Sequence, residues 1–320
     1  MLAVLTEHLT HCATVKNSTT RSWYSILQIA LVVVALAHLA YSSGKKPKAY
    51  RDINAIGHRV IGYPTGVGNW YSLDREKEIG TQVSAAFEKS TSLLDDPLTE
   101  SYLDRLAQTI ARNSDAQLPI TIRVIDSEDS YALTFAGGHL YISRGLLLHL
   151  QNEGELAAAI ARGVAHTALR SATGEATRAH LMETAGTVIG INPPVYSTDP
   201  DLAHTLGLLN FRRKDEFAAD YFGIQYLYVS GYAPECFISF IQKAWPASTT
   251  TAHAFSSFPP RTERLDALQK EIKEVLPKQS GAVTDTETFE AFRKRLLGLP
   301  PPKPSPRQPT LIRSESQELN

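Results

Sequence analysis

The chain has 320 residues, of which 43% are hydrophobic and 20% are charged, and its formal net charge is −1 at pH 7. These proportions are typical of a globular protein with one sizeable core or two small ones. A nearly neutral chain without a long Lys/Arg block creates no field that attracts nucleic acid, so we expect no nucleic-acid partner.

A long apolar run at residues 23–41 precedes the globular pattern. A run of about 20 residues just spans a bilayer, and Trp23, Tyr24 and Tyr41 at its ends suit the headgroup level. Basic residues before the run and small residues near its end also fit a signal peptide. Three interpretations stay open: an uncleaved membrane anchor, a cleaved signal and a buried soluble helix. The first two place the rest of the chain at or beyond a membrane.

The segments outside the globular pattern have biased compositions. Residues 1–22 are interpreted as a leader, and residues 42–71, rich in Gly, Lys and Pro, as a linker. Residues 299–320 are dominated by Pro, Ser and charge, which is typical of a disordered tail. Between them we expect a metallopeptidase-like domain at 72–277, on grounds given below, and an accessory helix at 285–298.

Capping residues and apolar periodicity predict the helices of this domain. Ser72, Asp96 and Asn152 each stand as an N-cap before a helical pattern. Four further helices are expected at 215–230, 234–245, 261–275 and 286–297.

Two segments have the alternation of strands. Residues 119–125 are rich in β-branched side chains and predict one strand. Residues 131–143 predict a strand pair or a bent strand, with Gly137 and Gly138 at the bend.

One helix, in the stretch AAAIARGVAHTALR at 157–170, contains part of a zinc-peptidase pattern. In H-E-x-x-H, two imidazoles four residues apart lie about one turn apart on one face, so both reach one zinc ion. The Glu after the first His is the general base for the zinc-bound water. Here Arg162, Gly163 and His166 occupy these three positions. His166 alone is weak support, because a single His in an Ala-rich helix is more often a packing residue.

Five segments in the same order resemble the HtpX/BepA-like zinc metallopeptidases, the family that includes the CAAX prenyl proteases, and most of all their secreted BepA-type branch. The first three are SLDREKEIG at 72–80, YALTFAGGHLYISRGLL at 131–147 and EGELAAAIARGVAH at 153–166. The last two are RRKDEFAADYFGIQYLYVSGYAPE at 212–235 and FSSFPPRTERL at 255–265. The resemblance implies an α+β, mostly helical zincin-like (gluzincin) fold with a small β-sheet lining the cleft.

Residue by residue, the resemblance implies a degraded zinc site. His166 matches the second zinc-binding His, Glu216 matches the third ligand, and Asp220 matches the acid that orients it. Arg162 stands in place of the first zinc-binding His, and Gly163 stands in place of the catalytic Glu. Arg is permanently protonated and has no lone pair for zinc. We therefore expect no bound zinc and no intact catalytic residue.

Two other parts of the family pattern lie near the cleft. Phe258 stands where the family has a His that approaches the zinc. The resemblance also implies a strand edge that binds substrate, in which Tyr131 and Ala136 replace the family's Asn and Pro. This edge comprises Tyr131, Ala132, Leu133, Thr134, Phe135 and Ala136.

A buried Glu216 needs a positive partner if no zinc is present. Arg162 could supply one through a bidentate salt bridge that takes the place of the ion. The alternative is that Arg162 extends into solvent and Glu216 pairs with Arg212, Arg213 or water. A further alternative is that another histidine replaces the missing zinc ligand. None of the candidates lies on the same helix four residues before His166, as position 162 does. They are His139, His149, His180, His204 and His253.

The sequence therefore predicts a membrane-anchored or exported pseudopeptidase of the HtpX/BepA type that binds polypeptide or a membrane-protein partner in the cell envelope. Strand addition at the cleft edge would bind an extended chain. One alternative is an active but atypical zinc metalloendopeptidase in envelope protein quality control, with zinc as its cofactor. Another is a scaffold whose working parts are the apolar run and the Pro-rich tail. The resemblance to secreted bacterial members implies a bacterial periplasm.

Overall fold

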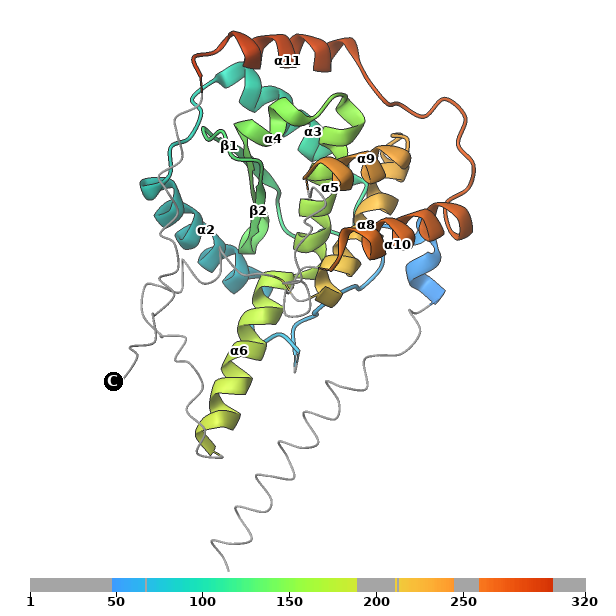
Figure 1. The fold of residues 1–320 in the computed structure, drawn as a ribbon. Helices are drawn as coiled ribbons and strands as arrows, with labels where there is room; N and C mark the ends of the chain where they lie inside the picture. Colours follow the sequence, from blue (N-terminus) through green and yellow to red (C-terminus); the bar gives the residue numbers. More distant parts are fainter. Residues whose placement is uncertain (1–47, 67, 189–210, 212, 245–258, 302–320) are drawn as a thin grey trace, which may run out of the picture.

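The computed structural model describes residues 48–66, 68–188, 211, 213–244 and 259–301, which are coloured in Figure 1. The leader, the apolar run at 23–41, Phe258 and most of the Pro-rich tail lie outside the described residues. In the part that is described, no helix combines the length and the apolar character needed to cross a membrane.

Helix α5, Glu153–Leu169, lies at the centre of the fold, and all of its residues are buried. The predicted N-cap is confirmed, because the Asn152 side chain accepts a hydrogen bond from the Glu155 amide. Small side chains let neighbouring elements approach this helix closely. The alanines with no exposed surface are Ala157, Ala158, Ala161 and Ala165.

A three-stranded sheet lies on one side of α5. Strand β3, His139–Ser143, is central, parallel to β1, Thr121–Ile125, and antiparallel to β2, Ala132–Phe135. The turn η3, Ala136–Gly138, connects β2 to β3. Gly137 and Gly138 have φ of 78° and 86°, a region that favours glycine. The predicted strand pair with its bend at these glycines is confirmed.

The sheet is covered on both faces, because successive side chains of a strand point to opposite sides. Phe135 and Tyr141 pack against Phe87 of helix α2, Leu73–Ser90. Leu140 and Ile142 belong to the main core around α5. The sheet therefore lies between α2 and α5 and fixes the distance from its edge strand to α5.

Three more helices pack on the other side of α5 or beside it. They are α8, Arg213–Val229, α9, Glu235–Ala244, and α10, Arg261–Glu274. Gly223 lets α8 approach α5, since a Cβ there would lie 3.2 Å from the Arg162 Cα and 2.9 Å from the Phe237 ring. The close approach brings side chains of α8 next to Arg162.

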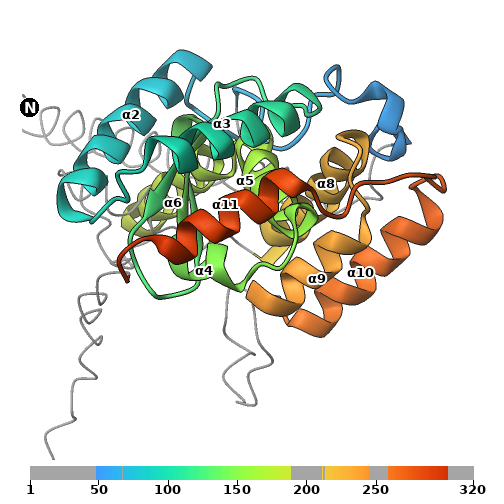
Figure 2. The same cartoon turned by 90° about the horizontal axis from the view of Figure 1, so that it is seen from above.

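The remaining helices complete a mostly helical α+β architecture, as the sequence predicted. Helix α3, Pro97–Arg112, starts at its predicted N-cap Asp96. Helix α4, Arg144–His149, and helix α6, Ser171–Val188, were not predicted. Helix α6 projects away from the body, whereas α11, Glu287–Gly298, lies across α3 and α4 (Figures 1 and 2).

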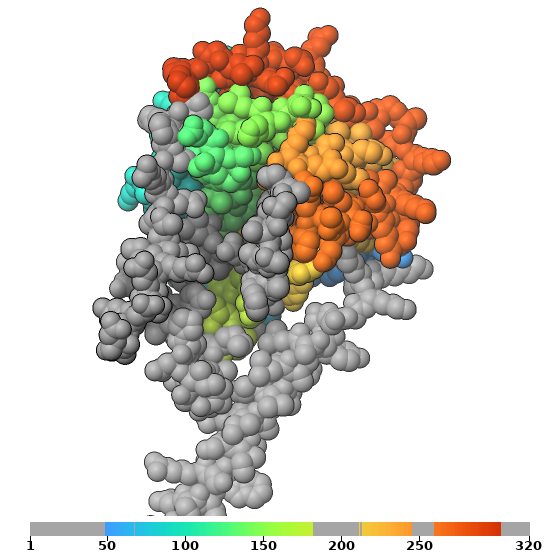
Figure 3. All heavy atoms as spheres, in the orientation of Figure 1, coloured from blue at the N-terminus to red at the C-terminus, as the bar shows by residue number. Residues whose placement is uncertain are grey.

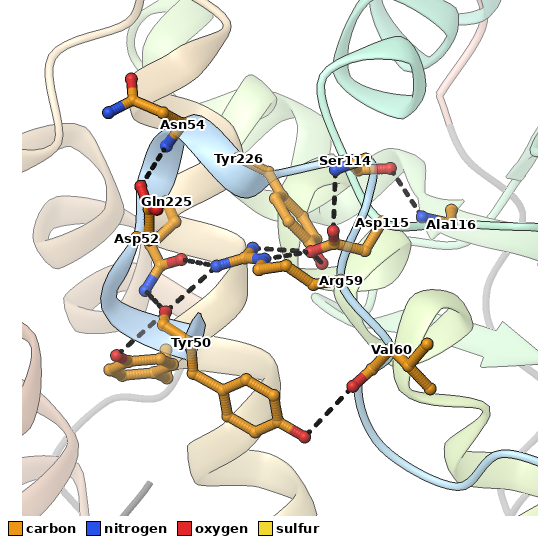
Figure 4. Close-up of polar contacts among 12 residues, drawn as sticks. Tyr50, Asp52, Asn54, Arg59, Val60, Ser114, Asp115, Ala116, Gln225 and Tyr226 are labelled. Atoms are coloured by element: carbon orange, nitrogen blue, oxygen red, sulfur yellow. Dashed lines mark hydrogen bonds and ion pairs between the residues drawn. The ribbon is translucent and has the colours of Figure 1, made fainter. Parts of the chain in front are cut away.

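The part of the expected linker that the structure describes, from residue 48 to 71, is packed into the fold. It forms two short helices, η1, Lys48–Arg51, and η2, Ile53–Ala55. Its buried Arg59 has three partners (Figure 4), of which the first is the Tyr50 carbonyl of η1 at 3.0 Å. Arg59 donates to Asp115 at 2.6 Å and 3.0 Å, and to the Gln225 side chain of α8 at 2.8 Å. The Tyr226 hydroxyl donates to the same Asp115 carboxylate at 2.8 Å. The segment expected to be a linker is therefore part of the folded domain.

Substitution Arg59→Met is expected to lower the free energy of unfolding by about 3–5 kcal/mol, because it leaves Asp115 buried without its cation. Urea unfolding measures the loss. The matched control is Arg51→Met, because Arg51 and its partner Glu274 have exposed side chains (52% and 43%). This control is expected to cost less than about 1 kcal/mol. Equal losses in both variants would contradict a stabilising role for the Arg59 network.

The C-terminal helix α11 is bound to the body at its end and along its side. The buried Arg144 side chain donates to the carbonyl oxygens of Leu296 and Leu299 at 2.9 Å and 3.1 Å. Arg295 pairs with Asp96, its Nε lying 2.7 Å from Oδ2. The Phe292 ring stacks on Tyr102 of α3, with centroids 4.5 Å apart. The accessory helix expected at 285–298 is therefore docked on α3 and α4.

The Asp96–Arg295 pair predicts a pH dependence of stability. The Arg295 hydrogen bond holds the pKa of Asp96 well below its usual range. A depressed pKa stabilises the fold above the unfolded value of about 3.9, and this contribution is lost as the pH falls toward the folded value. Arg295→Gln is expected to be less stable than wild type at neutral pH, and in urea unfolding the difference is expected to narrow only as the pH falls below about 3, toward the depressed pKa of the folded state. Lys294→Gln, on the exposed face of α11, is the control and should show no such convergence.

Candidate functional site

The candidate site lies where α5 faces α8. Arg162 and His166 are one turn apart on α5, and Glu216 and Asp220 are one turn apart on α8. Residues in this relation lie on one face of their helix, so both pairs meet at the interface. The structure thus brings together the four residues that the sequence assigned to the degraded zinc site.

Four charged side chains form what we call the charge cluster: Arg162, Glu216, Asp220 and Arg264. Arg162 pairs with Glu216, and its Nε donates to Asp220 Oδ1 at 3.3 Å. Arg264 of α10 donates to both oxygens of Asp220, at 2.6 Å and 2.8 Å. The exposed fractions of these four residues range from 1% to 8%, so two cations and two anions neutralise each other inside the protein. The predicted pairing of Arg162 with Glu216 is present, but in place of the expected bidentate bridge Arg162 contacts Glu216 through one nitrogen and Asp220 through its Nε.

Burial and neighbouring charges act in opposing directions on the pKa values of Glu216 and Arg264. Burial raises the pKa of Glu216, and the nearby Arg162 guanidinium acts to lower it. Burial lowers the pKa of Arg264, but the Asp220 carboxylate outweighs this effect and the net pKa is raised. Arg264 therefore stays charged, and each carboxylate of the cluster has a guanidinium in contact.

His166 lies beside the cluster but does not join it through a hydrogen bond. Its Nδ1 is 3.3 Å from Ser171 Oγ, while its buried Nε2 has no hydrogen-bond partner and lies 3.9 Å from Glu216 Oε1. The Phe211 ring stacks on the imidazole, with centroids 4.2 Å apart. Burial, together with Arg162 and Arg264, lowers the pKa of His166 well below its usual value, so the ring is neutral.

The residues present do not fit a catalytic zinc ion. Such a site uses three protein ligands and a water molecule, whereas this site offers one imidazole nitrogen and one carboxylate. The Arg162 guanidinium binds that carboxylate, and a cation there repels a metal ion. Nowhere in the described ranges do three or more His, Cys, Asp or Glu side chains gather closely enough to hold a metal ion. The disagreement with the family's zinc chemistry lies in the donor set itself.

The histidines weighed as replacement ligands have other environments where they are described. His139 interacts with Thr121 Oγ1 at 2.9 Å, and the His180 ring stacks on Trp70. His149 ends helix α4. His204 and His253 lie outside the described residues.

Side chains of the sheet lie directly against Gly163, the residue at the general-base position. A Cβ on Gly163 would lie 2.9 Å from Leu140 Cδ2 and 3.3 Å from Thr134 Oγ1. A Glu at this position would therefore displace the Leu140 side chain. Gly163 itself has no group that accepts a proton, so general-base catalysis from this position is absent.

The expected substrate edge forms strand β2 with its flanks. Among the described residues β2 pairs only with β3, so it is an edge strand. The Ser143 amide donates to the Tyr131 carbonyl at 2.9 Å. Antiparallel pairing alternates, so the peptide groups of Ala132 and Thr134 point away from β3 toward the free edge. Phe135 is buried and Ala136 starts the turn, so the accessible edge is shorter than the six expected residues.

Sequence reasoning missed two residues of this site. Arg264 is the second-last residue of the segment FSSFPPRTERL at 255–265, and it stands where the family that the segment resembles has an Arg, which was the available signal. Phe211, which stacks on His166, had no signal beyond its place just before α8. The first completes the charge balance, and the second covers the imidazole.

A double-mutant cycle tests the salt bridge between Arg162 and Glu216. Arg162→Met is expected to cost about 3–5 kcal/mol in urea unfolding, because Glu216 then lacks its cation. Adding Glu216→Gln is expected to recover at least about 2 kcal/mol of that loss. The control cycle uses Arg213 and Glu263, whose side chains are 44% and 49% exposed, with expected coupling below about 1 kcal/mol. Additive losses at Arg162 and Glu216 would rule out the charge cluster as a stabilising unit.

Comparison with known proteins places this geometry in a family. Residues 97–272, more than half of the chain, match the model of peptidase family M48. A Vibrio cholerae protein is 29% identical over 180 residues, which are 52% of this chain and 37% of that protein. Beta-barrel assembly-enhancing proteases are 27% identical in Yersinia pestis (56% of this chain, 39% of the relative) and 23% identical in Escherichia coli K12 (73% and 51%). The chain thus spans between about a third and a half of these relatives. By the match over residues 97–272, the chain belongs to peptidase family M48.

Proposed function

We propose that this chain is a pseudopeptidase of family M48, which binds extended polypeptide at the edge of β2 and does not hydrolyse it. The observation that carries the proposal is the Arg162–Glu216 salt bridge inside the charge cluster. It occupies the carboxylate that the resemblance assigns to zinc, and it does so with a side chain that cannot bind a metal.

Two independent losses support inactivity. The first is the metal, because Arg162 replaces one ligand and neutralises another. The second is the base at Gly163, and general-base catalysis contributes about 10²–10⁴-fold to rates. Restoring either feature alone would leave a severely impaired enzyme.

The retained parts support polypeptide binding. Strand β2 presents the peptide groups of Ala132 and Thr134 at an edge beside α5. Extended peptides bind such edges through main-chain hydrogen bonds, and this needs no metal. The relatives named as beta-barrel assembly-enhancing proteases favour a cell-envelope setting, and a membrane-anchored or exported chain in a bacterial periplasm fits residues 23–41.

One observation favours the alternative of an active, atypical zinc metalloendopeptidase. The buried Nε2 of His166 has no hydrogen-bond partner, which is unusual for a polar atom in a core. A metal would satisfy it if the Arg162 side chain moved away. Metal content separates the two proposals.

Zinc content after incubation with zinc, measured by elemental analysis of the purified chain, is the test. The wild-type chain is expected to hold far less than one zinc and to leave unstructured protein substrates intact. Arg162→His is expected to take up about one zinc, because His166 and Glu216 then complete three ligands. Gly163→Glu, combined with Leu140→Ala to make room, is expected to add measurable hydrolysis to that variant. Stoichiometric zinc in the wild-type chain would overturn the proposal in favour of the active enzyme.

A further inference from the structure

A small pocket lies between the edge strand and α5. Its volume is about 20 Å³, and it is formed by all three strands, α5 and α9. Its lining includes Thr134 of β2, Leu140 of β3, Ile160, Arg162 and Gly163 of α5, and Phe240 of α9. In the space-filling view the β2–α4 region (green) and α9 with α10 (orange) meet on one face of the molecule (Figure 3).

The pocket is placed to receive one side chain of a strand added to β2. Side chains of neighbouring strands that lie opposite each other point to the same face of the sheet. Thr134 points toward α5, since its Oγ1 lies 3.3 Å from a Cβ built on Gly163. The residue of an added strand beside Thr134 therefore points to the same face of the sheet, toward α5.

The size of the pocket limits that side chain. About 10–15 Å³ on this measure holds one water-sized group, so 20 Å³ holds little more than a single methyl group. The walls restrict expansion, because Ile160 and Phe240 are 2% and 1% exposed and Leu140 is 4% exposed. The lining is mostly apolar but includes Arg162, so a basic side chain would be repelled by the guanidinium and would be costly to desolvate.

We infer that the β2 edge selects polypeptides with an alanine-sized side chain at the position beside Thr134. The inference rests on the proposed function, because it assumes that an extended chain adds to β2. Gly163 is then a specificity-determining residue, because a side chain at this position would push Leu140 and so reduce the space in the pocket. Phe240 also lines the pocket and limits its size.

Selection from a display library of random short peptides on the immobilised full-length chain is the experiment. A consensus peptide is then measured by fluorescence polarisation with Gly, Ala, Ser, Val, Leu or Lys at the selected position. Alanine is expected to bind best, and leucine at least about ten-fold more weakly, as for an extra group in a filled apolar pocket. Gly163→Ala is expected to shift the preference to glycine, and Phe240→Leu to admit valine or leucine.

The controls keep packing separate from specificity. Phe237→Leu changes an equally buried ring of α9 that does not form the pocket, and Gly298→Ala adds a methyl group where nothing lies within 4 Å. Both are expected to leave the preference unchanged, with thermal unfolding confirming that each variant is folded.

Two outcomes separate the inference from the proposed function. Peptides that bind without a preference for small residues, or a preference that Gly163→Ala and Phe240→Leu leave unmoved, overturn the inference alone. A chain that binds no peptide overturns the proposed function and the inference with it. Peptide binding that appears only after deletion of residues 246–257 would make this chain its own occupant, and that also overturns the inference as stated.

Discussion

The neutralisation of buried charge at the α5–α8 interface is the constraint on which the rest of the site depends. Carboxylates at Glu216 and Asp220 cannot stay ionised in a core without cations in contact. The arginines of α5 and α10 supply these cations, so three helices are joined through one set of ion pairs. These ion pairs balance the buried charge of the α5–α8 interface without a metal ion.

Local signals made much of the fold predictable. Ser72, Asp96 and Asn152 cap helices in the structure because a short polar side chain next to an apolar repeat satisfies the first amides of a helix. Gly137 and Gly138 mark the β2–β3 connection because the chain there needs positive φ. These effects act within a few residues, so one sequence is enough to find them.

Other features depend on contacts between distant residues, and one sequence does not contain them. Arg59 and Asp115 are 56 positions apart, so nothing nearby in the sequence showed that the expected linker is packed. Arg170 adopts φ of 55° between α5 and α6, a conformation that residues other than glycine rarely take. The local sequence therefore did not predict that one helix ends here and another begins. In the site, the need of a buried Glu216 for a cation predicted its pairing with Arg162. The second cation, Arg264, is brought to the site by the packing of α10, which the sequence did not reveal.

The packed N-terminal segment also limits where the domain can work. Because Arg59 fixes the segment that begins at residue 48 to the body, only six positions of the sequence, 42–47, separate the apolar run from the packed domain. From residue 41 to residue 48 an extended chain reaches no more than about 25 Å. If the run is retained in a bilayer, the domain is tethered within roughly its own diameter of the lipid surface. Under the proposed function, a polypeptide would then be bound close to where it leaves or enters the membrane, and a polypeptide far from the membrane would not be reached.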